Sequence, residues 1–249
     1  MLNYRPILSL PADLDAGVAA VERFGGRPWG LADALWPVCK ECGGRQSLLA
    51  QLSHHPERLD LGAQGRMLFV FYCNNYPGMC DSWGGSSGAN ACFVLDAEQL
   101  EGTPFDHPPA GAIDPDDHAV VISSWQAFDD GFDEATAKKL LTLTDYDDLP
   151  DSALAQLSGS THLGGVPWWI QDANEAPGGD WTFVGQLDTY YSFHEPPKSE
   201  TPWISCDEKR YEGRTHVGTG PNFGDAGMGY IFLRSAHTRP EGWFFWQCS

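Results

Sequence analysis

Four cysteines in the first third of the chain have the residue type and the spacing of a metal site. Cys39 and Cys42 are separated by two residues in the segment Cys-Lys-Glu-Cys-Gly-Gly, which is the spacing of a knuckle that offers two thiolates from one tight turn. Cys73 and Cys80 form a second pair with six intervening residues, whereas zinc pairs usually have about two to four. We therefore predict a structural zinc ion bound by these four sulfurs, with no open coordination position for a substrate.

Two other interpretations of the cysteine pattern remain open. The four thiols can stay unpaired and pack as small hydrophobic side chains, or His54 or His55 can replace one sulfur as a ligand. In the zinc interpretation, the glycines after Cys42 allow backbone N–H groups to point at sulfur and orient the ligands. Zinc removal is then expected to unfold the N-terminal half, because metal binding and folding are coupled in such sites.

Motifs of known catalytic sites are incomplete in this chain. The segment Gly84–Gly88 formally matches a nucleophile elbow around Ser86, but an apolar strand rather than a helix is expected to follow it. The glycine-rich segments 218–224 and 224–229 lack the third glycine of a dinucleotide fingerprint and the Lys-Ser/Thr of a P-loop. We predict no catalytic residue and favour a non-enzymatic function.

Acidic side chains dominate the 249 residues. The formal net charge is −19, from 34 Asp and Glu against 15 Lys and Arg. This charge opposes a phosphate backbone, so nucleic acid is not expected as a ligand. The excess is concentrated between Asp96 and Asp151, where fifteen carboxylates accompany only Lys138 and Lys139. A basic protein partner would be attracted there; the alternative is a solvated face that keeps the protein soluble.

The N-terminal residues and the lengths of the apolar runs indicate the cellular location of the protein. Residues 1–6 do not have the pattern of a secretory signal. The longest apolar run, residues 67–72, is far shorter than the roughly 20 residues that cross a bilayer. We expect a cytoplasmic protein without membrane contact, as a monomer or weak dimer. Seven cysteines in a reducing compartment favour thiolate ligation over disulfides.

An internal repeat organises the sequence. Phe24-Gly-Gly-Arg-Pro-Trp29 returns as Leu163-Gly-Gly-Val-Pro-Trp168, and each copy precedes an apolar Gln-Leu stretch and then a glycine turn with an apolar strand. The strands are short and rich in Phe, Tyr, Val and Trp, which is typical of antiparallel sheet. We predict an α+β, mainly antiparallel β fold, duplicated into two sheets, with few helices and a zinc knuckle in the first half. The expected helices are residues 12–24, 133–143 and 151–157.

The repeat also suggests a domain organisation and three candidate binding residues. We expect a first repeat in residues 1–95, an acidic connector with short helices in 96–157 and a second repeat in 158–249, all in one compact unit. Gln51, Gln186 and Asp225 lie in the repeated motifs and are predicted to meet between the copies. The alternative is that these side chains satisfy buried backbone groups.

Together, these motifs resemble the YwqG-like family of uncharacterised bacterial proteins over nearly the whole chain. The resemblance is carried by residues 24–28, 36–37, 49–52, 163–167, 183–187, 223–230 and 245–249. The cysteine segment is instead similar to the C-terminal domain of programmed cell death protein 2, which also places Cys-x-x-Cys-Gly-Gly before an apolar Gln-Leu stretch and a second cysteine pair after the next strand. The family implies a duplicated, mainly β fold and no established activity. The eukaryotic relative implies a chaperone-like role toward a basic ribosomal protein.

These observations give two functional hypotheses. The first is a non-enzymatic, zinc-containing protein-binding module, chaperone-like or toxin-neutralising, that receives a basic partner at a groove between the repeats and at the acidic segment. The second is an enzyme or small-ligand-binding protein that uses the same groove. The second hypothesis predicts a deep pocket in which polar groups with shifted pKa values converge.

Overall fold

Strands dominate the computed structural model, which describes residues 1–249 except 15–20, 77–78, 102–117, 144, 147–148, 208–214 and 237. In this described part of the chain the α-helices are α1 (Glu134–Leu140) and α2 (Asp151–Leu154), and four 3-10 turns accompany them at Pro11–Asp13, Asp33–Leu35, Ala97–Gln99 and Ala173–Glu175. None of these helices has both the length and the apolar character that a bilayer crossing requires.

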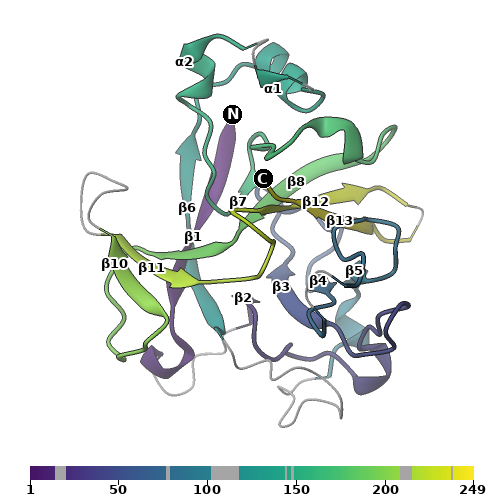
Figure 1. The fold of residues 1–249 in the computed structure, drawn as a ribbon. Coiled ribbons are helices and arrows are strands. Elements are labelled where there is room, and N and C mark those ends of the chain that lie inside the picture. The colour runs from purple at the N-terminus through teal and green to yellow at the C-terminus, as the bar shows by residue number, and fades with distance from the viewer. Residues whose placement is uncertain are drawn as a thin grey trace.

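Ten strands form one continuous antiparallel sheet in the order β13-β12-β8-β7-β1-β6-β2-β3-β4-β5 (Figure 1). The strands are β1 (Leu2–Ser9), β2 (Arg23–Phe24), β3 (Ser47–Ser53), β4 (Met67–Tyr72), β5 (Asn90–Leu95), β6 (Val120–Asp129), β7 (His162–Gly164), β8 (Thr182–Asp188), β12 (Met228–Arg234) and β13 (Glu241–Gln247). The sheet is strongly curved, because its two outermost strands, β5 and β13, contact each other. The curvature brings the start and the end of the strand order together.

A second, smaller sheet has the order β10-β11-β9 and projects to one side of the molecule in Figure 1. Its strands are β9 (Tyr190–Phe193), β10 (Ile204–Asp207) and β11 (Thr215–Thr219). The predicted α+β fold with two related sheets is therefore wrong: the protein is mostly antiparallel β, with one large sheet and one small sheet. The large sheet is continuous because β1 pairs with β7 and β6 pairs with β2, which joins the two halves of the sequence.

The strand order of the large sheet is symmetric about its centre, where β1 and β6 pair with each other. On one side lie β2, β3, β4 and β5, and on the other lie β7, β8, β12 and β13. The register agrees as well, because Arg23 pairs with Gln51 as His162 pairs with Gln186. The range 96–157, expected as a connector, contributes the central strand β6 in addition to α1 and α2.

Alternating side chains of the large sheet form three apolar clusters. On β4, Leu68, Val70 and Tyr72 belong to a central cluster that also contains residues of β12 and β13. The intervening β4 residues Met67, Phe69 and Phe71 pack on the opposite face. On β12 the corresponding alternate residues pack with α1 and α2 in a third cluster. Because both faces are covered, β4 is a buried apolar run without polar alternation.

The helix predictions have different outcomes. Both α1 and α2 lie inside their predicted ranges, and the side chain of Asp133 caps α1 by accepting a hydrogen bond from Thr136 N–H at 2.7 Å. The prediction of a helix that reaches Phe24 is wrong, because β2 pairs with β3 and β6 at that point. Residues 15–20 of that predicted helix lie outside the described chain. Gly25, which directly follows the predicted helix, turns the chain out of β2 with φ 64°.

Candidate metal centre

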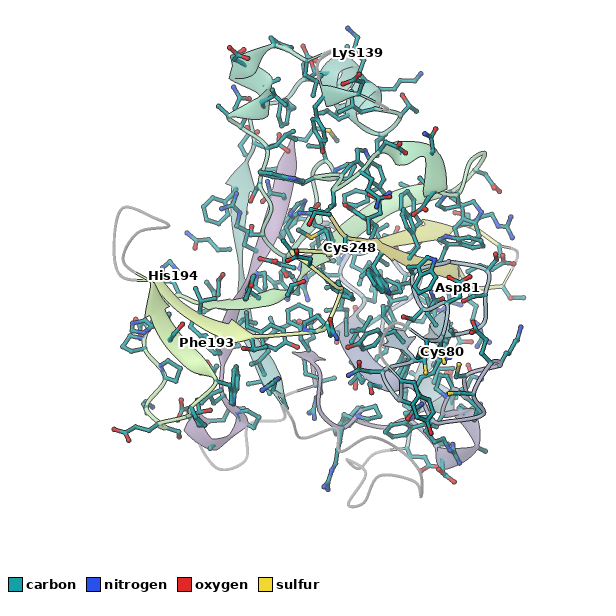
Figure 2. The ribbon with its side chains drawn as sticks, viewed as in Figure 1. Cys80, Asp81, Lys139, Phe193, His194 and Cys248 are labelled. Atoms are coloured by element: carbon teal, nitrogen blue, oxygen red, sulfur yellow. The ribbon has the colours of Figure 1, made fainter. Side chains whose placement is uncertain are left out.

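The four predicted cysteine ligands lie together. One sulfur from each of Cys39, Cys42, Cys73 and Cys80 falls within 4.8 Å of every other. Cys39, Cys73 and Cys80 are buried and Cys42 is partly exposed. Figure 2 shows Cys80 among sulfur atoms on the side of the molecule away from Phe193 of the small sheet. The group therefore has the composition and the proximity of a metal site.

Two short loops bring the cysteines together. The first loop is a tight turn in which Gly43 N–H donates to Cys39 O at 2.9 Å and Cys39 N–H donates to Gly44 O at 2.8 Å. The second begins where β4 ends, and Cys73 N–H donates to Ala89 O at 2.7 Å just before β5. Both loops are thus fixed by backbone hydrogen bonds at the end of the β4–β5 hairpin. Pro77 and Gly78, two of the six residues between Cys73 and Cys80, lie outside the described residues.

The sulfur spacing fits a tetrahedral ion. A metal–sulfur bond of about 2.3 Å places the sulfurs of a regular tetrahedron about 3.8 Å apart, and Cys42 Sγ lies 3.6 Å from Cys73 Sγ. That separation is far longer than a disulfide bond of about 2.05 Å, and all four cysteines are free. The residues present therefore fit a closed four-thiolate site that would leave no position for a substrate.

N–H donors around the sulfurs complete the site. Gly44 N–H donates to Cys42 Sγ at 3.4 Å, as the glycine pattern predicts. The side-chain amide of Asn75 lies 3.4 Å from Cys73 Sγ and 3.8 Å from Cys42 Sγ, and it also donates to Arg45 O at 3.0 Å. A Cβ at Gly44 would come within 2.3 Å of the Asn75 amide nitrogen, so a larger residue there would displace this donor. Such donors orient thiolates and disperse their charge.

The protonation of the metal-free thiols differs within the group. The Gly44 N–H holds the pKa of Cys42 at about 7, well below that of an ordinary thiol. Burial raises the pKa of Cys73 and raises that of Cys80 strongly. At neutral pH a metal ion must therefore displace protons from Cys73 and Cys80 before it can bind their thiolates.

The loop after Cys80 connects this site to the last strand of the chain. Trp246 N–H on β13 donates to Trp83 O at 3.2 Å, and the two indoles meet edge to face at 6.2 Å. Gly85 lies against Trp243, so closely that a Cβ at position 85 would come within 2.2 Å of the indole nitrogen. The cysteine loops therefore contact β13 as well as the first half of the chain, and they stabilise the contact between the two outermost strands.

Of the three predicted binding residues, Gln51 and Gln186 form side-chain hydrogen bonds to backbone groups. The Gln51 amide accepts from Trp29 N–H at 2.7 Å and donates to Trp29 O at 3.0 Å. The Gln186 amide accepts from Trp168 N–H at 2.8 Å and donates to carbonyl oxygens of residues 158 and 160. Both glutamines are fully buried and each bonds to backbone within its own half. Asp225 is exposed, and its carbonyl oxygen accepts from Ser249.

The histidines offered as alternative ligands lie elsewhere. His54 Nδ1 accepts from Leu61 N–H at 3.0 Å and His55 Nδ1 accepts from Glu57 N–H at 3.2 Å, in the turn after β3. Sequence reasoning missed Asn75 as a second partner of the sulfurs; its signal was a short amide side chain two residues after Cys73.

The glycine-rich segment around Ser86 does not form a nucleophile elbow. The chain turns through residues 84–88 and enters β5 at Asn90. The hydroxyl of Ser87 donates to Gly84 O at 3.0 Å, and no histidine hydrogen bond to Ser86 or Ser87 occurs among the described residues. The strand that follows is the arrangement the sequence predicts, and it differs from the strand–turn–helix of that elbow.

Comparisons with models of known protein families, with curated proteins and with solved structures gave no match.

Proposed function

We propose that the chain is a zinc protein in which the metal has a structural role and the surface around the metal loops binds a basic protein partner. The convergence of the four cysteine sulfurs within 4.8 Å carries the metal part of this proposal. A tetrahedral set of four thiolates suits zinc or iron, and zinc is the usual ion of closed structural sites with a Cys-x-x-Cys knuckle. When bound, zinc would supply fixed thiolate geometry and no reaction step.

Metal analysis of the purified protein tests the first part. We expect one zinc per chain by inductively coupled plasma mass spectrometry, in a colourless protein. Cys42→Ser and Cys80→Ser should lose the ion. The matched control Cys248→Ser, outside the cluster, should retain it. A protein without zinc, or a red protein that contains iron, would overturn the zinc assignment.

Exposed apolar side chains support the protein-binding part. Tyr76 and Met79 lie on the loop between Cys73 and Cys80 and are 63% and 79% exposed, and Trp83 is 41% exposed just after Cys80. We name these three residues the loop patch. A metal ion would hold the patch in one conformation before a partner arrives, which reduces the ordering cost of binding. Large aromatic and methionine side chains are enriched in protein interfaces.

The charge of the chain indicates the kind of partner. A net charge of −19 attracts a basic surface and speeds its encounter. The loop patch has acidic neighbours, since Asp81 N–H donates to the Glu41 carboxylate at 2.9 Å. We therefore favour a basic protein, bound through apolar contacts at the loop patch and guided by acidic charge. The chaperone-like and toxin-neutralising roles are two forms of this proposal.

Salt and substitution together test the partner class. The protein is used as bait in its native cell, and proteins crosslinked to it are identified by mass spectrometry. A basic partner that is lost at high salt and lost with Tyr76→Ser plus Met79→Ser would support the proposal. The control Leu141→Ser removes another exposed apolar side chain, 37% exposed, at the end of α1 and should keep the partner. Equal capture by both variants would overturn the loop patch.

A further inference from the structure

A small cavity lies between the two halves of the sequence, and its lining includes Tyr72 and Asn74, the two residues that flank Cys73. It has a volume of about 260 Å³, and both halves line it: Leu49 and Tyr72 come from the first, whereas Tyr191 and Asn222 come from the second. The volume is below the roughly 300–1,000 Å³ of sites for drug-sized molecules, so a fragment-sized molecule is the largest that fits.

Two buried tyrosine hydroxyls face this cavity with unused donor capacity. Tyr191 is 5% exposed, and its hydroxyl has no hydrogen-bond partner in the described chain. Tyr72 is 4% exposed, and its oxygen accepts from Asn222 N–H at 3.2 Å, which leaves the hydroxyl proton free. A phenol has an ordinary pKa of about 10, so both tyrosine side chains are O–H donors at neutral pH.

The described residues that line the cavity are uncharged apart from one histidine, His118. Among them there is no Asp, Glu, Lys or Arg, although the chain as a whole is strongly acidic. An ion placed there would lose water without gaining a counter-charge from these residues, which is strongly unfavourable. The cavity is therefore suited to an uncharged molecule that accepts hydrogen bonds.

Backbone features keep this space open. Gly25 and Gly26 turn beside the cavity with φ 64° and 66°, and a Cβ at Gly25 would lie 3.3 Å from the Tyr191 hydroxyl. His118, also in the lining, has φ 60°, a conformation that non-glycine residues seldom adopt outside functional or tightly constrained sites.

In the second half of the chain, other residues fill the space beside the corresponding glycine turn. Gly164 and Gly165 have φ 70° and 66°, the same conformation as the first pair. A Cβ at Gly165 would lie 2.9 Å from Asn3 Cβ and 3.2 Å from the Asp130 carboxylate. The N-terminal ammonium pairs with that same carboxylate. Of these two glycine turns, only the one at Gly25 lines the cavity. The repeated Gly-Gly motif therefore does not by itself create such a space.

We propose that this cavity binds a small uncharged molecule whose carbonyl oxygen, of the amide or lactam kind, accepts hydrogen bonds from the hydroxyls of Tyr72 and Tyr191. Leu48 and Leu49 would contact the apolar part of the molecule. No cysteine and no residue of the loop patch is among the described residues that line this site.

Benzamide, 2-piperidone and N-methylacetamide are suitable neutral probes, with benzoate and benzylamine as charged controls of the same shape as benzamide. The protein is labelled with ¹³C at the tyrosine ζ carbon, and Tyr72→Phe and Tyr191→Phe assign the two signals. We expect neutral probes to shift both signals at millimolar concentration and the charged controls to leave them in place. Tyr191→Phe should weaken probe binding about three- to tenfold, which is the loss of affinity expected when one hydrogen bond is removed.

Tyr191→Phe should also leave the melting temperature unchanged, because the hydroxyl has no partner in the described protein. Tyr76→Phe, which removes an exposed hydroxyl outside the cavity, is the matched control and should leave probe binding intact. The proposal is overturned if no neutral probe moves either signal, if benzoate binds as well as benzamide, or if Tyr191→Phe has no effect on affinity.

Discussion

The two outer strand pairs of the large sheet occupy equivalent places but are stabilised differently. We call β4 and β5 with their cysteine loops the cysteine edge, and β12 and β13 the aromatic edge. Among the described residues, seven buried apolar side chains form the cluster of Phe69 and Phe71 on the outer face of the cysteine edge. On the aromatic edge, twelve described residues form the cluster around Trp169 and Tyr230, with α1 packed over it. In this part of the chain the smaller cluster is therefore the one beside the four cysteines.

Matched positions show the same difference in detail. Phe69 pairs with Gln51 across the strands as Tyr230 pairs with Gln186. The Tyr230 hydroxyl donates to Trp168 O at 2.7 Å and accepts from Ile170 N–H at 2.8 Å, whereas Phe69 has no hydroxyl to make such bonds. The aromatic edge is thus fixed by rings and hydrogen bonds. The cysteine edge instead carries the four cysteines, where we propose a metal ion.

Loss of a metal ligand should have the largest effect and should separate the two edges. Cys42→Ser, or zinc removal by a chelator, is expected to cost about 5 kcal/mol or more of unfolding free energy, because metal binding supplies folding energy in such sites. Hydrogen exchange should rise first in β4 and β5. An equal increase in hydrogen exchange at both edges, or no increase at either, would show that the metal does not stabilise the cysteine edge in particular.

Removal of the central ring of the aromatic edge should have the next largest effect. Trp169→Ala is expected to cost about 3–5 kcal/mol, because the indole is 1% exposed, packs on Tyr230 at 4.7 Å and donates to Leu140 O at 2.8 Å. Chemical denaturation measures the loss. Metal content should stay at the wild-type value in the folded variant; release of the metal would mean that the edges fold as one unit.

The buried glutamines should have smaller and similar effects at the two edges. Gln51→Ala and Gln186→Ala each leave backbone groups of the neighbouring loop without a partner, at a cost of about 1–3 kcal/mol. The exposed Gln156 provides a control, and Gln156→Ala should change stability by less than about 0.5 kcal/mol. Unchanged stability in Gln51→Ala or Gln186→Ala would favour a binding role for that glutamine.

The cysteine cluster was predictable because its determinants are mostly local. A Cys-x-x-Cys turn followed by two glycines specifies both the ligands and the Gly44 N–H donor. The six-residue spacing of Cys73 and Cys80 was less informative, because the distance between them depends on the β4–β5 hairpin and on Asn75. The loop contact with Trp246 joins residues more than 150 positions apart, which no local pattern specifies.

The number of sheets was not predictable from the repeats. Each half presents similar strands, but whether they form one sheet or two depends on the pairing of β1 with β7 and of β6 with β2. The sequence pattern did not predict the strand β6, because burial does not alternate cleanly along Val120–Asp129 and the surrounding segment is acidic. The cavity likewise depends on Tyr72 and Tyr191 meeting across the halves.

Acidity should weaken metal binding at the cysteine edge and leave the packing of the aromatic edge in place. Burial raises the thiol pKa values of Cys73 and Cys80, so both are protonated in the metal-free protein at neutral pH, and below about pH 7 Cys42 takes up a proton as well. Each proton that the metal must displace lowers the apparent affinity about tenfold per pH unit. Zinc affinity should therefore fall as the pH falls, and more steeply below pH 7 than above it. Competition with a chromophoric chelator across pH 5.5–8.5 measures this slope, and a flat profile would mean that these thiols are not the ligands.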